Sequence, residues 1–298
     1  KYPQAAFPYD DLVATNRDRG RGKPEYELLD TGVFDQDRYF DVFVEVAKAS
    51  PEDLLIQITV HNRGPEAATL QLLPTLWFRN DWSWGGEAAR PNLRQVAQDK
   101  TGGIIALSQR ELGERFCYAE DAAALLFTEN ETNTERLVGT PNPSPYVKDG
   151  IGNYVVHGKQ DAVNPGKQGT KVSAHYPLTL KAGESRTIRL RLCDPPVKGS
   201  KKALGEFFGK RFESVFQTRL QEANEFYATV IPPSLNADAA SVMRQALAGM
   251  LWSKQFFCYD VGQWLKAHGI QPYKANQRSI RNDRWGHMVN ADIISMPD

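Results

Sequence analysis

The sequence predicts a β plus α fold, in which a large antiparallel β-sandwich is followed by long helices. Short runs of alternating apolar and polar residues, separated by turn signals, fill residues 1–199. From Gly199 onward the apolar residues recur at the three- and four-residue spacing of a helix. The last helical stretch is apolar over most of its circumference and therefore needs partners on several sides. We expect a β-sandwich domain over 1–199, a linker helix over 200–233 and the start of a helical domain over 234–298.

The first strands are predicted by strict alternation. Arg38–Ala47 reads RYFDVFVEVA, and one face of this strand is entirely apolar. That face is the expected core face: Phe40, Val42, Val44 and Val46. Leu54–His61 alternates in the same way, and the turn Asn62–Pro65 follows it. We expect Ala67–Phe78 to return beside Leu54–His61 as an antiparallel hairpin.

Further strands complete the predicted sandwich. They are Gly103–Gln109, Phe116–Ala119, Ala123–Thr128, Asn153–Val156, Thr170–Leu180 and Ser185–Cys193. The turn Lys181–Glu184 between the last two is a second hairpin signal. Many short strands with turns between them indicate two broad sheets. Thr132–Lys171 is rich in Gly, Asn and Pro, and a loop of this length is either functional or a disordered excursion.

Two helices are predicted after the strands. Lys202–Val230 has helical spacing and is ended by Pro232 and Pro233. The next helix, Ala237–Leu265, is expected to be capped by Asn236 or Ser234. The residues after it are too few to cover so apolar a helix, and the opening KYPQAAFPYDDL reads like the interior of a longer chain. We therefore expect a piece of a larger protein, in which the helical domain continues.

Composition limits the ligands and the compartment. The 36 basic and 36 acidic residues give no net charge, which favours a neutral ligand over nucleic acid or an anionic membrane. No apolar run reaches the roughly 18 residues of a membrane span. The three cysteines lack Cys-x-x-Cys spacing, which indicates free thiols in a reducing, cytoplasmic compartment. The five histidines lack ligand spacing, so we expect no metal and no cofactor.

The stretch Leu72–Trp84, LLPTLWFRNDWSW, is the strongest functional signal. It places three tryptophans within eight residues, beside Arg79, Asn80 and Asp81. Indole faces stack on sugar rings, and guanidinium, amide and carboxylate groups bond to pairs of hydroxyls. The alternative interpretation is a strand end whose tryptophans fill a core.

Three segments resemble bacterial members of glycoside hydrolase family sixty-three, the processing α-glucosidase family. They are Leu76–Trp84 (LWFRNDWSW), Ala246–Leu265 (ALAGMLWSKQFFCYDVGQWL) and Arg281–Asp298 (RNDRWGHMVNADIISMPD). The resemblance extends over the whole chain. It implies a supersandwich-like β-sandwich, a linker helix and the opening helix of an (α/α)6 toroid, which would be the catalytic barrel.

The resemblance implies an inverting exo-α-glucosidase that acts on α-glucosides or oligosaccharides. Inversion uses a general acid and a general base roughly 6.5–9.5 Å apart. In this family the acid lies in a Trp-Asp motif just beyond the point where this chain stops, and the base lies near the far end of the barrel. We therefore assign no catalytic residue here and expect the remainder of the barrel as partner. Two alternatives stay open: a disaccharide phosphorylase on the same scaffold, and a non-catalytic carbohydrate-binding or scaffold module.

The resemblance implies that the substrate-binding residues form two rims around the same barrel mouth, one from the sandwich and one from the barrel entrance. They are Arg79, Asn80, Trp82, Trp84, Asn282, Asp283, Trp285 and His287. The same residues could instead fix the interface between sandwich and barrel, because buried polar groups mostly bond to one another. Asp283 is better explained as a helix cap or an arginine partner than as the acid. Sequence alone cannot pair the other acids that we considered: Asp81, Glu87, Asp99 and Glu120.

Overall fold

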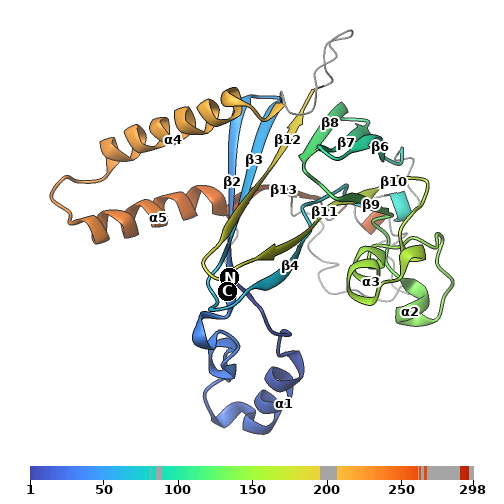
Figure 1. Ribbon diagram of the computed structural model, residues 1–298, viewed down its shortest axis with the longest axis horizontal. Helices are drawn as coiled ribbons and strands as arrows, with labels where there is room; N and C mark the ends of the chain where they lie inside the picture. The colour runs from blue at the N-terminus through green and yellow to red at the C-terminus, as the bar shows by residue number, and fades with distance from the viewer. Residues whose placement is uncertain are drawn as a thin grey trace. The chain divides into compact units, whose positions relative to one another are not determined.

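The computed structural model describes residues 1–80, 82–84, 89–194, 207–260, 262, 265–266 and 289–294 (Figure 1). The chain divides into two compact units, Lys1–Arg219 and Leu220–Asp298. The first holds an antiparallel β-sandwich with short helices, and the second holds helices and a two-stranded sheet. The predicted β plus α class is confirmed.

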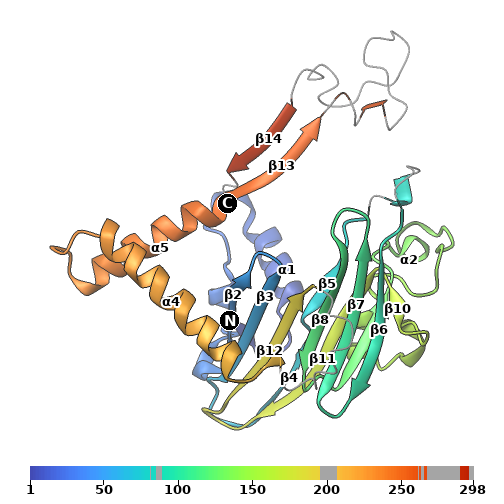
Figure 2. The same ribbon diagram turned by 90° about the horizontal axis from the view of Figure 1, so that it is seen from above.

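The larger sheet of the first unit has eight strands in the order β1-β2-β3-β12-β8-β7-β6-β10 (Figure 2). Their bounds are β1 Tyr2–Pro3, β2 Tyr39–Ser50, β3 Asp53–Asn62, β6 Asn92–Asp99, β7 Gly102–Gln109, β8 Gly113–Glu120, β10 Gln168–Gly169 and β12 Ser185–Cys193. The smaller sheet is built around β11. Its strands are β4 Ala68–Leu72, β5 Thr75–Trp77, β9 Ala124–Thr128 and β11 Lys171–Leu180.

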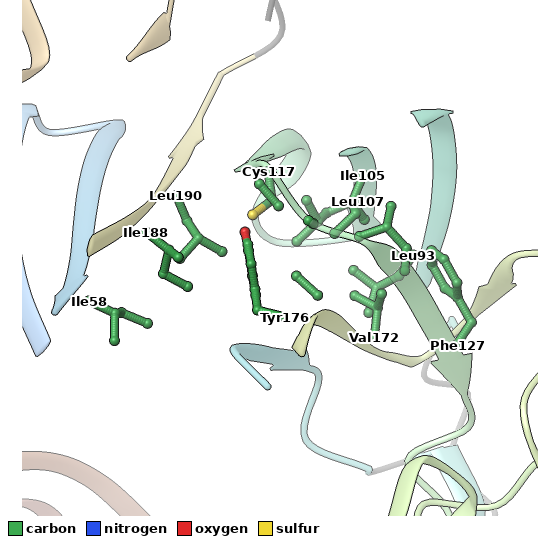
Figure 3. Packing of buried hydrophobic residues seen from close by; sticks show 14 residues of the cluster. Ile58, Leu93, Ile105, Leu107, Cys117, Phe127, Val172, Tyr176, Ile188 and Leu190 are labelled. Carbon is green, nitrogen blue, oxygen red and sulfur yellow. The ribbon is translucent and has the colours of Figure 1, made fainter. Parts of the chain in front are cut away.

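The core lies between the two sheets. Side chains from the larger sheet, such as Ile105, Cys117 and Leu190, meet side chains from the smaller sheet, such as Phe127, Val172 and Tyr176 (Figure 3). Phe127 has no exposed surface, and Val172 is 1% exposed. Two antiparallel sheets that bury their facing side chains in this way form the predicted sandwich.

Both predicted hairpins are wrong, although their strands exist. The returning segment β4–β5 pairs with β11 and not with β3. Strand β12 pairs with β3 and β8, so the turn Lys181–Glu184 carries the chain from one sheet to the other. A turn between two alternating runs reverses the chain in either case, and the pattern alone does not distinguish a hairpin from a connection between sheets.

The predicted core face of β2 is only half correct. Phe40 is buried with Val60 and Leu180, but Val44 is 61% exposed and Val46 is 54% exposed. Strand β4 packs against the Phe40 end of β2, and among the described residues of the first unit none gives the other end such cover. The opposite face of the sheet is partly buried instead, at Leu55 and Tyr118.

Helices occupy segments where the sequence predicted none. Helix α1 (Tyr9–Arg19) precedes the sandwich, and α2 (Thr134–Val138) and α3 (Gly150–His157) lie within the long loop. The predicted strand Asn153–Val156 is wrong, because these residues belong to α3. Ile151 of α3 packs on Leu126 and Val163, and this tertiary contact outweighs the β propensity of a short apolar run. Five short 3-10 helices are also present in the described part of the chain. They are η1 Gly20–Gly22, η2 Leu28–Thr31, η3 Asp35–Asp37, η4 Trp82–Trp84 and η5 Gln160–Ala162.

The predicted linker helix is α4 (Lys210–Val230), which begins later than expected. The aromatic residues at its start pack on the outer face of the larger sheet: Phe207, Phe208 and Phe212 against Leu55 and Tyr118. Arg191 donates to both carboxylate oxygens of Asp53 at 2.8 and 2.6 Å, and to the Phe207 carbonyl at 3.1 Å. These contacts fix the start of the helix on the sheet.

Helix α5 (Ala237–Ser253) begins where the sequence predicted but ends early. The Asn236 side chain accepts a hydrogen bond from the Ala239 amide at 2.9 Å, so Asn236 is the cap. The predicted continuation to Leu265 is wrong, because β13 (Lys254–Asp260) follows and pairs with β14 (Val289–Ile294). The aromatic run Phe256–Tyr259 favours a strand. No side chain of α5 is buried, and its exposed apolar residues are Val242, Met250, Leu251 and Trp252.

Candidate functional site

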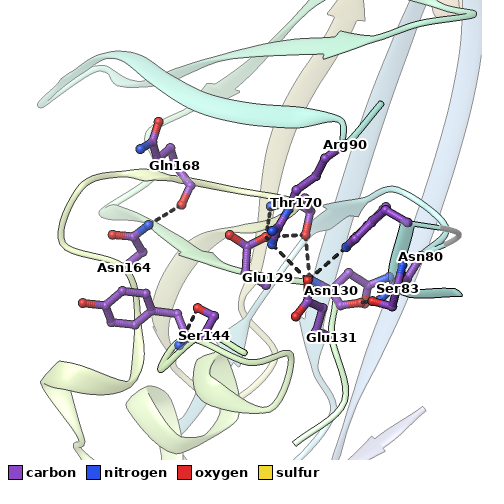
Figure 4. A network of polar contacts seen from close by, with 12 residues as sticks. Asn80, Ser83, Arg90, Glu129, Asn130, Glu131, Ser144, Asn164, Gln168 and Thr170 are labelled. Atoms are coloured by element: carbon purple, nitrogen blue, oxygen red, sulfur yellow. Dashed lines mark hydrogen bonds and ion pairs between the residues drawn. The ribbon is translucent and has the colours of Figure 1, made fainter. Parts of the chain in front are cut away.

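The topology brings several strand ends to one edge of the sandwich. Strands β5 and β9 end at Trp77 and Thr128, and each is paired antiparallel with the first residues of β11. The segments that leave β5 and β9 therefore lie beside Thr170, which precedes β11 (Figure 4). Arg90, two residues before β6, reaches the same place. We call this group, made of Trp82, Arg90, Glu129 and Glu131, the rim cluster.

Two asparagines fix the backbone around the rim cluster. Asn130 donates from Nδ2 to the Phe78 carbonyl at 2.9 Å, and Asn80 donates from Nδ2 to the Asn130 carbonyl at 3.0 Å. The Oδ1 atom of Asn80 accepts from the Ser83 amide at 3.1 Å. Both ends of the Asn80 amide are therefore used within the sandwich, where they hold the turn that carries Trp82.

One guanidinium connects the two acids of the rim cluster. Arg90 Nη2 lies 3.0 Å from Glu131 Oε1 and 2.8 Å from Glu129 Oε2. Trp82 donates from Nε1 to the same Glu131 oxygen at 2.9 Å, and the Arg90 Cζ atom lies 5.8 Å from the Trp82 ring. The Glu131 side chain is 7% exposed and that of Glu129 16%, whereas Arg90 is 48% exposed. The acids are therefore mostly buried, and the guanidinium is accessible.

Glu129 is held from its other side by Thr170. Its Oε2 atom accepts from the Thr170 amide at 3.1 Å and from the Thr170 hydroxyl at 2.7 Å. The hydroxyl oxygen in turn accepts from the Asn130 backbone amide at 2.7 Å. A buried carboxylate needs such bonds, because an unbonded one would pay a large desolvation cost. The position of Glu129 is thus fixed before any ligand arrives.

The long loop packs beside the rim cluster. Asn133 caps α2 by accepting from the Arg136 amide at 3.1 Å, and it donates to both carboxylate oxygens of Asp149. Lys171 donates to the Lys148 carbonyl at 3.0 Å. Partial burial, together with the neighbouring Lys148 charge, lowers the pKa of Lys171. The loop therefore has its own helices and caps, and it meets the rim cluster where the Lys148 backbone amide donates to the Glu131 carbonyl at 3.0 Å.

The predicted sugar-contact residues have different places. Asn80 and Trp82 lie at the rim cluster. Arg79 instead lines a neighbouring surface depression of about 420 Å³, opposite the turn between β7 and β8. Trp84 belongs to η4, and its side chain lies outside the described part of the structure. The second predicted rim also lies outside the described residues: Asn282, Asp283, Trp285 and His287.

Of the other acids considered from the sequence, the two that the structure describes, Asp99 and Glu120, each bind a different partner. Thr101 donates to Asp99 and lowers the pKa of its carboxyl group. Glu120 binds Arg189 through two bonds of 2.6 Å. Asp81 and Glu87 lie outside the described residues.

Sequence reasoning missed three members of the rim cluster: Arg90, Glu129 and Glu131. A signal was present, because Glu-Asn-Glu follows directly after the apolar run Ala124–Thr128. Polar residues at the end of a buried strand lie at the edge of a sheet, where sites are often built. Nothing in the sequence, however, indicated that Arg90 would meet them.

The rim cluster does not have the carboxylate spacing of an inverting glycosidase. Its two carboxylate oxygens contact one nitrogen at 2.8 and 3.0 Å, so they lie closer together than the roughly 6.5 Å that an inverting pair requires. Among the described residues, no group of three His, Cys, Asp or Glu side chains could hold a metal ion. None of the described helices is long and apolar enough to cross a membrane.

Comparisons with known proteins define the relatives of the chain only in part. No family model matches it. The chain is 34% identical over 336 aligned residues to the Saccharomyces cerevisiae protein YMR196W, which is described as uncharacterized. The alignment includes all of this chain but only 31% of the yeast protein, so the chain spans about a third of its relative.

Two solved structures share weak likeness with the chain. The polysaccharide lyase BACCELL_00875 aligns at a TM-score of 0.32 and 10% identity, over 52% of this chain and 20% of the lyase. A protein assigned as a kojibiose phosphorylase from the human microbiome aligns at 0.26 and 14% identity, over 78% of this chain and 25% of that one. With TM-scores this low, neither likeness defines the fold or the activity of this chain.

Proposed function

We propose that this chain is the sandwich and linker part of an inverting exo-α-glucosidase that acts on α-glucosides or oligosaccharides. Its catalytic acid and base lie outside the chain. The proposal rests on the resemblance of Leu76–Trp84, Ala246–Leu265 and Arg281–Asp298 to glycoside hydrolase family sixty-three. In the full enzyme, the sandwich supplies a rim for the substrate, and the barrel supplies the chemistry.

The rim cluster is the structural observation that carries this proposal. The motif Leu76–Trp84 delivers Trp82 to the edge of the sandwich, where its indole lies beside a half-exposed guanidinium and donates a hydrogen bond to a buried carboxylate. An aromatic face next to fixed hydrogen-bond donors is what a pyranose ring requires. The zero net charge of the chain agrees with an uncharged ligand.

The test uses the natural protein that carries this chain. We expect it to hydrolyse 4-nitrophenyl α-glucoside without phosphate, and NMR of the first product should show β-glucose, the inverted anomer. Activity that requires inorganic phosphate and yields glucose 1-phosphate would support the phosphorylase alternative. Binding of oligosaccharides without turnover would support the carbohydrate-binding module. Release of α-glucose as the first product would refute inversion.

A further inference from the structure

We propose that Arg90 is the ligand-facing residue of the rim cluster, and that Glu129 and Glu131 make it selective for uncharged sugars over anionic ones. The inference rests on the proposed function for the class of ligand. It adds a residue, a role and a selectivity that the sequence did not predict. The occupant is a neutral pyranoside, which Arg90 would bind through neighbouring hydroxyls.

Arg90 has hydrogen-bond donors that its ion pairs do not use. A guanidinium presents five N–H donors in a rigid fork. Both ion pairs of Arg90 use the same nitrogen, Nη2, and no residue in the described part of the chain accepts a hydrogen bond from Nε or Nη1. The side chain is 48% exposed, so a ligand can reach it. Two donors of one guanidinium are suitably spaced for a pair of adjacent sugar hydroxyls.

Arg90 is also held in place. Glu131 is fixed by the Trp82 indole, and Glu129 is fixed by the amide and hydroxyl of Thr170. A long side chain that is already ordered loses less entropy when a ligand binds, so weak contacts to hydroxyls contribute more to affinity. The Trp82 ring beside the guanidinium adds an apolar surface for the sugar ring.

The charge of the rim cluster decides which sugars it accepts. One guanidinium faces two carboxylates, so the formal charge of these three side chains sums to −1. The carboxylates are 7% and 16% exposed, and water screens charges less well at such positions than at the open surface. A free arginine attracts phosphate or a uronate, but the excess carboxylate charge beside Arg90 repels them. It still donates hydrogen bonds to an uncharged diol.

A matched pair of ligands tests this selectivity. Methyl α-glucoside and methyl α-glucuronide differ by one charged group, and ligand-observed NMR titration of the 298-residue chain at pH 7 measures both dissociation constants. We expect the glucoside to bind at least tenfold more tightly. Arg90→Gln should weaken glucoside binding at least tenfold. Arg94→Gln removes an exposed arginine of β6 that lies outside the rim cluster, and it should change neither constant.

Glu129→Gln tests the charge without removing the acceptor for Thr170. It should improve glucuronide binding at least threefold, so that the preference for the glucoside falls. Thermal melting identifies a variant that is unfolded, and Glu129→Gln then decides the outcome if Arg90→Gln does not fold. Any one of four results would overturn the inference. Two concern the natural sequence: tighter binding of the glucuronide than of the glucoside, or no binding of either sugar. Two concern the variants: unchanged glucoside binding by a folded Arg90→Gln protein, or an unchanged glucuronide dissociation constant in Glu129→Gln.

The inference and the proposed function can fail separately. If the natural protein hydrolyses α-glucosides with inversion but Arg90→Gln leaves binding unchanged, only the inference fails. If glucoside binding depends on Arg90 while the natural protein shows no hydrolysis, the exo-α-glucosidase proposal fails and the neutral-sugar site remains.

Discussion

Removing Arg191 should release the start of α4 and strongly destabilise the first unit. Arg191→Met keeps the aliphatic stem but leaves both Asp53 oxygens and the Phe207 carbonyl without their bonds. The side chains of this pair are only 15% and 16% exposed, so water replaces those bonds poorly. Breaking a buried pair costs about 3–5 kcal/mol. Allowing for the exposed fraction, we expect about 2–4 kcal/mol, or roughly 6–12 °C in Tm for a unit of this size.

The assay is urea unfolding followed by far-UV circular dichroism, with Arg186→Met as the matched control. Arg186 is on the same strand and also pairs with an aspartate, Asp121, but both side chains are 54% exposed. An exposed pair of this kind contributes about 0–1 kcal/mol. Equal losses for Arg191→Met and Arg186→Met, or a loss below about 0.5 kcal/mol for Arg191→Met, would refute the reasoning from burial.

The remaining predictions concern α3 and the core. Gly150→Ala should lower the free energy of unfolding of the first unit by more than about 1 kcal/mol, because the new Cβ would collide with the Ala162 carbonyl. Gly152→Ala meets open space and should raise that free energy by about 0.5–1 kcal/mol. Urea unfolding measures both changes. Burial raises the pKa of Cys117 from 9.0 to about 12, so the folded state holds its proton more tightly. The resulting stability is complete below pH 9 and is lost as pH rises toward 12. Cys117→Ala should therefore reduce the loss of unfolding free energy over this range by up to about 1.4 kcal/mol per pH unit. If the variant loses stability with pH as steeply as the natural sequence, the raised pKa of Cys117 is contradicted.

The strands were predictable from the sequence, but their partners were not. Alternation located β2 and β3, and short apolar runs between turn signals located β7, β8, β9, β11 and β12. Strand β6 was missed, since Arg94 and Gln95 interrupt its apolar pattern. Pairing depends on contacts between segments far apart in the chain, such as β3 with β12, and local patterns contain no record of them.

In the helical part, too, local features were predictable from the sequence and contacts between distant segments were not. The cap at Asn236 was predictable because capping depends on one side chain and an amide three residues away. The end of α5 at Ser253 was not, because it depends on the pairing of β13 with the distant β14. At the rim cluster, the sequence identified Trp82 and Asn80 from their local composition. Glu131 lies 49 residues from its partner Trp82, and this distance hid it.

The order of pairing in the larger sheet has a consequence for synthesis in the cell. Strand β3 is complete at Asn62, but the neighbour on its second side, β12, begins only at Ser185. At about 5–20 residues per second, a ribosome needs roughly 6–25 s to add the residues between them. During that interval β3 presents unpaired amide and carbonyl groups, which can template aggregation. The yield of folded protein should therefore depend on the supply of chaperones and on how fast the ribosome translates the codons between β3 and β12.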